Sequence, residues 1–489
     1  MINKKNLFLG LAAITQIAPA QKQPNIIVFL VDDMGLMDTS VPFITDSLGQ
    51  IERHPLNDFY RTPNMERLAE QGIRFSTFYA QSLSSPSRAC IMTGQNAARH
   101  GITTYINPVE NNRTEFGPHD WNWDGLRRST FTLPRLLKSN GYKTIHVGKA
   151  HFGHWGAEAE FPEAIGFDVN IAGSAAGHAG SYLGENGYGY TDGDRVRAVP
   201  GLSKYHGSHT FLTEAITIEA QEQLRIAASE QKPFFLYMAQ FAVHSPFEAD
   251  DRFIGNYANS GKPERTNAFA TLVEGMDKSL GDILNCLENL HIADNTLIFF
   301  IGDNGSAAPL GDARGYTSSA PLRGKKGTEY EGGFRVPFIV SWAHPSAKSK
   351  VQRLLPIAKG EVQTQFGQLV DILPTIARIT DSQIPDSVII DGQDLSTLIA
   401  GKKDPNHADT FLMHYPHGGP GSYYTSYREG DWKIIYYYNP QHAEYPSTLL
   451  FNLKNDPYEK TDLSRKEPNQ VKRLVNKLAK ELESKGAIP

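Results

Sequence analysis

Short apolar runs rich in β-branched and aromatic residues alternate along the chain with segments of helical spacing. The runs lie at residues 26–31, 144–147, 234–238 and 297–301. Helical spacing of apolar residues is found at residues 65–71, 213–229 and 268–290. Strands that alternate with helices are typical of a parallel sheet covered by helices. The pattern therefore predicts an α/β fold with a large, mostly parallel central sheet.

The pattern changes after residue 375. Turn-forming residues are frequent up to residue 427, and an aromatic run at 432–438 and a charged helical segment at 468–485 follow. This favours a smaller C-terminal α+β domain with an antiparallel sheet. We expect a main domain at residues 21–385 and a C-terminal subdomain at residues 386–489. The glycine-rich stretch 173–193 is expected to be a surface loop.

The first twenty residues have the pattern of a secretory signal peptide. Lys4 and Lys5 precede the apolar residues 7–14, and residues 18–20 place small side chains where a signal peptidase reads them. No later stretch approaches the roughly 18 apolar residues of a membrane span. We therefore expect an exported protein, periplasmic or secreted, with residues 1–20 removed and no membrane span.

Composition argues against several classes of function. The chain has 48 Lys and Arg against 53 Asp and Glu, a formal net charge of −5, which indicates no basic face for nucleic acid. Two cysteines, Cys90 and Cys286, are too few for a disulfide framework or a thiolate metal site. Neither lies near the expected cleavage point, where a lipid anchor would attach. We expect two buried thiols.

Charged and polar residues follow each of the four predicted strands. They are Asp32-Asp33, Lys149 with His151, His244, and Asp303-Asn304. Ligands of open parallel sheets bind beyond the carboxyl ends of the strands, so these residues are expected to converge on one site.

Two of these strand ends offer only oxygen ligands. Asp32, Asp33, Asp303 and Asn304 supply three carboxylates and one amide carbonyl, which Ca²⁺ and Mg²⁺ prefer, whereas zinc favours histidine or cysteine. A lone Asp-Asp pair is more often a turn or a helix cap. Two such pairs at separate strand ends favour a site for a hard cation.

A helix is expected to begin near Ser84. Ser85 suits the cap, Pro86 the first helical position and Gly94 the exit. Ser84 would then lie at the positive end of the helix, where backbone amides and Arg88 can hold an anion.

Residues 84–94, Ser-Ser-Pro-Ser-Arg-Ala-Cys-Ile-Met-Thr-Gly, resemble the signature of the type I, formylglycine-dependent sulfatases of the alkaline phosphatase superfamily. That signature has a cysteine or serine, any residue, Pro-Ser-Arg, three residues, and a Leu/Met-Thr-Gly close. Other segments are similar to this family in the same order, namely 24–35, 62–72, 141–151, 244–246, 303–305, 326–333 and 451–457. The resemblance implies an alkaline-phosphatase-like fold and hydrolysis of a sulfate ester by the main domain.

The resemblance further implies that Ser84 is oxidised to formylglycine, whose hydrate carries two hydroxyls on one carbon. An ordinary serine would keep a transferred sulfate as a stable ester, whereas loss of a proton from the second hydroxyl expels it. The cation, Ca²⁺ rather than Mg²⁺, would be bound by the hydrate of residue 84 together with Asp32, Asp33, Asp303 and Asn304.

Charge suggests the remaining roles in this family pattern. Arg88, Lys149 and Lys326 are expected to compensate charge on the sulfate oxygens and on the nucleophile. His244 is the expected acid for the leaving alcohol and His151 the expected base, and these two roles can be exchanged.

Two further features refine the expectation. Lys325 stands beside Lys326, but the family pattern places the lysine directly before Gly-Thr, which favours Lys326. Serine in place of cysteine at position 84 implies an oxygen-independent, radical-type maturation enzyme as a partner.

The identity of the ester is less well indicated. Sugars are held by aromatic faces and directional polar groups, so a sulfated saccharide of glycosaminoglycan, mucin or algal type is expected, as in the secreted bacterial glycan sulfatases that the chain resembles. We expect His154, His414 and His417 to contact it. The alternatives are a phosphoesterase of the same superfamily, which usually holds more metals, and a non-catalytic binding protein whose residue 84 stays serine.

Overall fold

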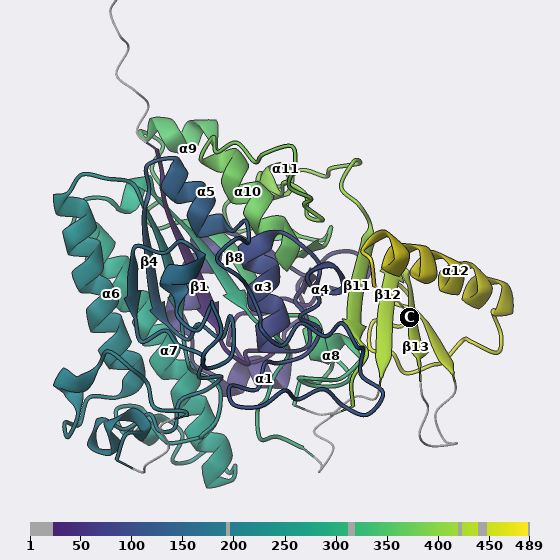
Figure 1. The fold of residues 1–489 in the computed structure, drawn as a ribbon, viewed down its shortest axis with the longest axis horizontal. Coiled ribbons are helices and arrows are strands. Elements are labelled where there is room, and N and C mark those ends of the chain that lie inside the picture. The colour runs from purple at the N-terminus through teal and green to yellow at the C-terminus, as the bar shows by residue number, and fades with distance from the viewer. Residues whose placement is uncertain (1–22, 192–195, 312–317, 419–422, 439–446, 488–489) are drawn as a thin grey trace, which may run out of the picture.

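The structure is a computed structural model that describes residues 23–191, 196–311, 318–418, 423–438 and 447–487. The expected signal peptide, residues 1–20, lies outside them. A central sheet with its helices forms the larger unit, and a smaller sheet lies beside it, at the right of Figure 1. Within these ranges, no helix has both the length and the apolar character required to cross a membrane.

The central sheet has eight strands in the order β5-β4-β6-β1-β7-β8-β2-β9. Their bounds are β1 Asn25–Val31, β2 Ile73–Phe75, β4 Lys143–Gly148, β5 Val169–Ile171, β6 Phe234–Ala239, β7 Thr296–Gly302, β8 Phe338–Trp342 and β9 Val362–Gln363. The five strands from β5 to β7 run parallel, whereas β8 is antiparallel to β7 and β2. This confirms the predicted mostly parallel sheet. A separate parallel pair joins β3 (Phe78–Tyr79) and β10 (Gly367–Gln368).

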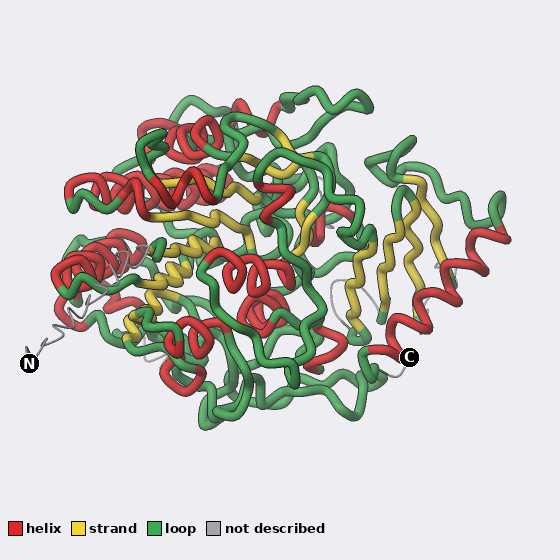
Figure 2. Tube along the Cα trace, turned by 90° about the horizontal axis from the view of Figure 1, so that it is seen from above, coloured by secondary structure: helices red, strands yellow, loops and turns green. Residues whose placement is uncertain are grey.

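Helices cover both faces of the central sheet, as Figure 2 shows from above. On β1, Ile27, Phe29 and Val31 pack with α6 (Leu212–Ser229) and α7 (Glu264–Asn289). The alternate residues of β1 pack with α3 (Ser84–Thr93), α5 (Leu133–Ser139) and α10 (Ile372–Ile379). Because both faces are buried, the strand is a continuous apolar run.

The other helical segments are short and connect these layers. They are α1 Pro55–Phe59, α2 Pro63–Gln71, α4 Ala97–His100, α8 Glu331–Phe334, α9 Lys350–Leu354 and α11 Ser396–Ile399. Turns of 3₁₀ helix are η1 Pro162–Ile165, η2 Gly184–Gly189, η3 Ser203–Tyr205, η4 Ile254–Asn256, η5 Ala293–Asn295 and η6 Leu369–Asp371.

The C-terminal sheet is antiparallel, as predicted. Its strands are β11 Thr410–Tyr415, β12 Tyr424–Glu429, β13 Trp432–Tyr437 and β14 Thr448–Asn452, in chain order. The helix α12 (Pro468–Ser484) packs on it through Leu474, Leu478 and Leu482. Residues 386–399 were expected in this subdomain, but Leu398 and Ile399 of α11 pack in the core of the larger unit. We therefore place the division between α11 and β11.

The glycine-rich stretch 173–193 is not the surface loop that its composition suggested. Within its described part, Tyr182 and Tyr188 are fully buried and belong to the core. A Cβ atom added at Gly177 would lie 2.9 Å from the ring of His151. The prediction was wrong because glycine here allows close packing of backbone against side chains rather than exposure.

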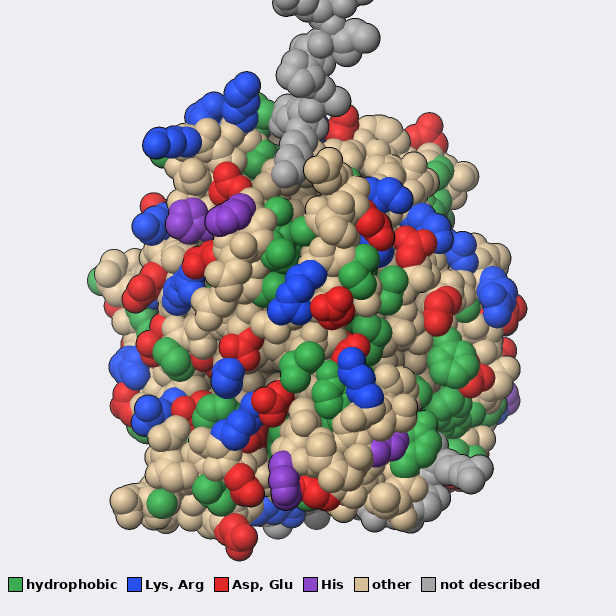
Figure 3. All heavy atoms as spheres, turned by 90° about the vertical axis from the view of Figure 1, so that its left-hand side faces the viewer, with side chains coloured by type: hydrophobic (Ala, Val, Ile, Leu, Met, Phe, Trp, Pro, Cys, Tyr) green, Lys and Arg blue, Asp and Glu red, His purple; other side chains and the backbone are tan. Residues whose placement is uncertain are grey.

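The thiols and the surface charges agree with the composition. Cys90 and Cys286 are free and buried, as expected. Figure 3 shows one face of the molecule, on which basic and acidic side chains are interspersed. This mixture is consistent with the small net charge.

A buried charge cluster joins the C-terminal sheet to the larger unit. Lys433 of β13 is 1% exposed, and its Nζ lies 2.6 Å from a carboxylate oxygen of Glu459 and 3.2 Å from one of Glu331 in α8. The hydroxyl of Tyr79 also donates to Glu331, at 2.8 Å. Because buried charges require partners, Lys433 fixes β13 against the start of α8.

Lys433→Met is expected to lower the free energy of unfolding by about 3–5 kcal/mol, because the buried Glu459 loses its cationic partner and Glu331 keeps only the more distant Arg335 as an ion-pair partner among the described residues. Lys477→Met serves as the control. Lys477 is 51% exposed and pairs with Glu429, so its loss is expected to cost less than about 1 kcal/mol. Urea unfolding measures both, and a Lys433→Met protein as stable as the unaltered one would contradict the assigned role.

Candidate active site

The parallel strands bring the residues at their carboxyl ends to one edge of the central sheet. Four of them, β4, β6, β1 and β7, are neighbours in the sheet. Asp32 and Asp33 follow β1, and Asp303 follows β7. Oxygen atoms of these three carboxylates lie within 4.8 Å of one another, and each residue is at most 1% exposed. Three buried acids in such proximity require positive charge beside them.

Two oxygen atoms at this edge are buried without a hydrogen-bond donor among the described residues, Asp32 Oδ1 and Asn304 Oδ1. The Asn304 amide is oriented by its Nδ2, which donates to Asp33 Oδ1 at 2.9 Å and to the carbonyl of Gly305 at 3.0 Å. An unsatisfied buried acceptor is unfavourable, and a bound cation would satisfy it. The all-oxygen set fits Ca²⁺ or Mg²⁺.

Each carboxylate also has a cationic side chain as partner. Lys149 lies 2.7 Å from Asp32, Arg88 lies 2.8 Å from Asp303, and Lys326 lies 2.6 Å from Asp33. Three negative and three positive groups therefore balance. A divalent cation would leave this buried site with excess positive charge, which favours an anionic ligand.

The pairs shift pKa values in different directions. Burial raises the pKa of Asp32 well above its ordinary value, in spite of Lys149 beside it. Burial acts on Asp33 too, but the neighbouring His244 and Lys326 favour its carboxylate form and lower its pKa. Burial lowers the pKa of Lys149. Burial acts on Lys326 too, but the combined attraction of the three carboxylates, that of Asp33 foremost, raises its pKa. Lys149 therefore releases its proton more readily than Lys326.

Ser84 is the first residue of α3, and Leu83 occupies the cap position. The expectation that Ser85 caps the helix was wrong, because its Oγ accepts a hydrogen bond from the amide of Ile106, at 3.0 Å. The first amides of a helix lack intrahelical acceptors, so Ser84 lies at a positive helix end. Lys149 Nζ is 3.1 Å from Ser84 Oγ. The serine is thus surrounded by positive charge.

Arg88 holds Asp303 and the backbone of Lys149 in place through hydrogen bonds. Its Nε and Nη2 donate to Asp303 Oδ2, at 3.1 and 2.8 Å, and its Nη1 donates to the carbonyl of Lys149, at 2.8 Å. Arg88 has no exposed surface and does not line the cavity described next. The sequence led us to expect Arg88 beside the sulfate oxygens. The geometry instead makes Arg88 a positioning residue for Asp303 and Lys149.

The site opens into a cavity of about 700 Å³. Four predicted residues line it, namely Ser84, His151, His244 and Lys326, and so do Tyr105, Glu110, His178, Arg197 and Tyr415. The ring of His178 stacks on His244, with centroids 5.1 Å apart and planes at 8°. Sequence reasoning missed Tyr105, Glu110, His178 and Arg197, because they follow no predicted strand and belong to no motif.

Backbone carbonyls orient both predicted acid–base histidines. His151 Nε2 lies 2.6 Å from the carbonyl of Ile106, and its Nδ1 is buried without a hydrogen-bond partner among the described residues. His244 Nδ1 lies 2.8 Å from the carbonyl of Ser245, and its Nε2 lies 3.5 Å from Asp33 Oδ2. Burial lowers the pKa of both rings well below the ordinary value. A carbonyl oxygen can only accept, so one hydrogen of each ring is assigned to the nitrogen that faces the carbonyl.

The three histidines expected to contact a saccharide do not line this cavity. His154 stacks on Trp123 with ring centroids 3.6 Å apart. His414 and His417 are 3% and 1% exposed, and each bonds to a threonine hydroxyl. Tyr415 lines the cavity instead, because successive side chains of a strand point to opposite faces.

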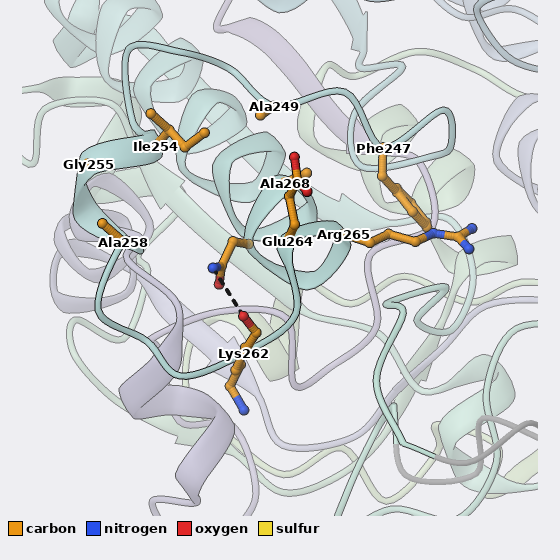
Figure 4. A pocket seen from close by; sticks show the side chains of 10 residues that line it. Phe247, Ala249, Ile254, Gly255, Ala258, Lys262, Glu264, Arg265 and Ala268 are labelled. Carbon is orange, nitrogen blue, oxygen red and sulfur yellow. Dashed lines mark hydrogen bonds between the residues drawn. The ribbon is translucent and has the colours of Figure 1, made fainter.

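A second hollow, of about 580 Å³, lies at the start of α7 (Figure 4). It is lined by Phe247, Ile254 and Ala268 among others, and the Arg265 guanidinium lies 5.1 Å from the centre of the Phe247 ring. None of its lining residues belongs to the acidic cluster or the basic groups around Ser84. The chemistry of the predicted motifs therefore belongs to the first cavity.

Comparison with known proteins agrees with the geometry. A family model described as "Sulfatase" matches residues 24–382, and one described as "N-sulphoglucosamine sulphohydrolase, C-terminal" matches residues 325–487. N-acetylgalactosamine-6-sulfatase from Mus musculus is 33% identical over 409 residues, which cover 81% of this chain and 71% of that protein.

Solved structures show the same architecture over nearly the whole chain. "Ps i-CgsB in complex with k-i-k-neocarrahexaose" has a TM-score of 0.70 at 25% identity and covers 94% of this chain and 92% of its own. Phosphonate monoester hydrolase of Agrobacterium radiobacter shares the fold, with a TM-score of 0.60 at 16% identity over 95% and 96% of the two chains. The family model described as "Sulfatase" matches most of the length of this chain. The chain therefore belongs to the type I sulfatase family of the alkaline phosphatase superfamily and is a sulfuric ester hydrolase.

Proposed function

We propose that this sulfatase removes sulfate from a saccharide. It would use formylglycine formed from Ser84 and a Ca²⁺ ion held by Asp32, Asp33, Asp303 and Asn304. The observation that carries the proposal is one chain of contacts. Ser84 Oγ lies 3.1 Å from Lys149 Nζ, which lies 2.7 Å from Asp32. The residue to be oxidised, a compensating cation and a metal ligand thus meet at a helix end suited to an anion.

The relatives and the cavity support a saccharide as the substrate. One relative is named for a sulfated amino sugar, and a structural neighbour is described in complex with k-i-k-neocarrahexaose. The cavity here, of about 700 Å³, is within the size range of small-ligand sites and combines aromatic with charged lining.

The charge and orientation of each side chain suggest its role in the reaction. Lys326, which lines the cavity, compensates charge on the sulfate oxygens, and Lys149, 3.1 Å from Ser84 Oγ, compensates charge on the oxygen of residue 84. His151 accepts, at its unpartnered Nδ1, the proton whose loss from the second hydroxyl of residue 84 expels the sulfate. His244 donates a proton to the leaving alcohol, because the Asp33 carboxylate, 3.5 Å away, stabilises its charged form.

Two groups complete the site when present. A divalent cation lowers the proton affinity of a hydroxyl beside it and polarises a sulfate oxygen. The aldehyde hydrate of residue 84 offers a second hydroxyl, so that sulfate is released without attack of water on sulfur. Asp32 and Asn304 suit the cation, since each has a buried oxygen with no donor among the described residues.

A phosphoesterase activity is less well supported. Phosphoesterases of this superfamily usually hold more metals, through extra histidine and aspartate ligands. In the part of the chain that the structure describes, one group of three such residues can hold a metal, namely Asp32, Asp33 and Asp303. Beside these carboxylates lie Lys149 and Lys326, which are not metal ligands.

Two expectations from the sequence complete the proposal. Serine at position 84 favours a radical-type, oxygen-independent maturation enzyme as a partner. Residues 1–20 favour export to the periplasm or beyond.

Protein purified from its own host is expected to contain a residue-84 peptide lighter by two hydrogens than the serine form, as measured by mass spectrometry. Ser84→Ala is expected to lower kcat/KM for a sulfated saccharide at least about 1000-fold. Ser84→Cys, made in a host with the aerobic cysteine-type maturation enzyme, is expected to be active. An unmodified Ser84 in fully active protein would exclude the proposed chemistry.

Arg88→Lys is expected to lower the affinity for Ca²⁺ about 10- to 100-fold, because it keeps the charge but loses the paired hydrogen bonds that orient Asp303. Arg99→Lys is the matched control, since Arg99 makes the same kind of pair with Asp391 away from the site. Calorimetric titration of the metal-free proteins measures both. Equal Ca²⁺ affinity in Arg88→Lys and the unaltered protein would reject the positioning role.

A further inference from the structure

The loop after α4 presents an aromatic side chain at the active-site cavity. Tyr105 is 45% exposed and lines the cavity together with Ser84. Its neighbour Ile106 is buried, and both its amide and its carbonyl are fixed. The amide donates to Ser85 Oγ at 3.0 Å, and the carbonyl lies 2.6 Å from His151 Nε2. Tyr105 is therefore held at a set position relative to the reacting residues.

Side-chain hydrogen bonds close the turn that follows Tyr105. Asn112 Nδ2 donates to the carbonyl of Tyr105 at 2.9 Å, and Asn112 Oδ1 accepts from the amide of Asn107 at 3.1 Å. The indole of Trp123 donates to the carbonyl of Asn107 at 2.9 Å. A loop ordered by its own contacts loses little conformational entropy when a ligand binds, which is typical of a recognition surface.

The same loop carries a carboxylate at the cavity. Glu110 is exposed, lines the cavity, and makes no side-chain hydrogen bond or ion pair with the described residues. An aromatic face packs well against the C–H face of a pyranose, and a carboxylate accepts hydrogen bonds from hydroxyl groups. Aryl and alkyl sulfates without hydroxyl groups would use only the first of these contacts.

We propose that Tyr105 and Glu110 determine the specificity of this sulfatase for a sugar. The pyranose ring that bears the sulfate stacks on Tyr105, and its free hydroxyls donate to Glu110. The inference rests on the proposed function, because the sulfate must lie at Ser84 for its sugar to reach this loop.

The test measures kcat and KM of the matured enzyme on sulfated monosaccharides and on 4-nitrophenyl sulfate, and the inhibition constant of inorganic sulfate. Tyr105→Ala is expected to raise KM for the saccharides about 10-fold or more, and Tyr105→Phe less than about 3-fold. Glu110→Gln is expected to raise KM for the saccharides but not for 4-nitrophenyl sulfate. Inhibition by sulfate is expected to stay unchanged, because sulfate would contact Lys326 and residue 84, which line the cavity, instead.

Tyr190→Ala is the matched control. Tyr190 is also 45% exposed but does not line the cavity, so its removal is expected to leave all constants unchanged. Saccharide KM values that Tyr105→Ala and Glu110→Gln leave unaltered would overturn the inference while the sulfatase activity stands. An unaltered enzyme that cleaves no sulfated saccharide and is not inhibited by sulfate would instead overturn the proposed function, and this inference with it.

Discussion

Three carboxylates with almost no contact with water determine how this protein is assembled. Asp32, Asp33 and Asp303 follow two adjacent parallel strands, β1 and β7, and their charges are stable only beside positive groups. Their partners, Arg88, Lys149 and Lys326, come from a helix, from the end of β4 and from a loop before α8. These ion pairs thus hold segments that are distant in the sequence at one edge of the sheet. A divalent cation bound there would leave the site with excess positive charge, which favours binding of an anion.

Backbone conformation and hydrogen bonds orient the side chains around this charge cluster. Asp33 and His151 adopt positive φ values of 60° and 58°, a conformation that is unfavourable for residues with a side chain. Ile106 links three parts of the site, because its amide bonds to α3, its carbonyl orients His151, and it follows Tyr105 in the chain. The start of α3, His151 and Tyr105 are therefore held in position relative to one another by one buried residue.

The sequence predicted the parts of the molecule that follow simple periodic rules. Asp32 and Asp303 could be placed together because buried strands are continuous apolar runs and their carboxyl ends meet. His178 and Tyr105 could not be found, since loops carry no periodic signal and their positions depend on hydrogen bonds between distant residues. His414 was assigned to the substrate by residue type alone, whereas the alternation of β11 turns it into the core.

The central claim is that the balanced cluster binds an anion because a cation gives it excess positive charge. Titration calorimetry of inorganic sulfate into the protein, once stripped of metal and once saturated with Ca²⁺, tests this most directly. The account predicts that Ca²⁺ strengthens sulfate binding about 10-fold or more, since the two charges attract across a site shielded from water. Equal sulfate affinity with and without Ca²⁺ would contradict it.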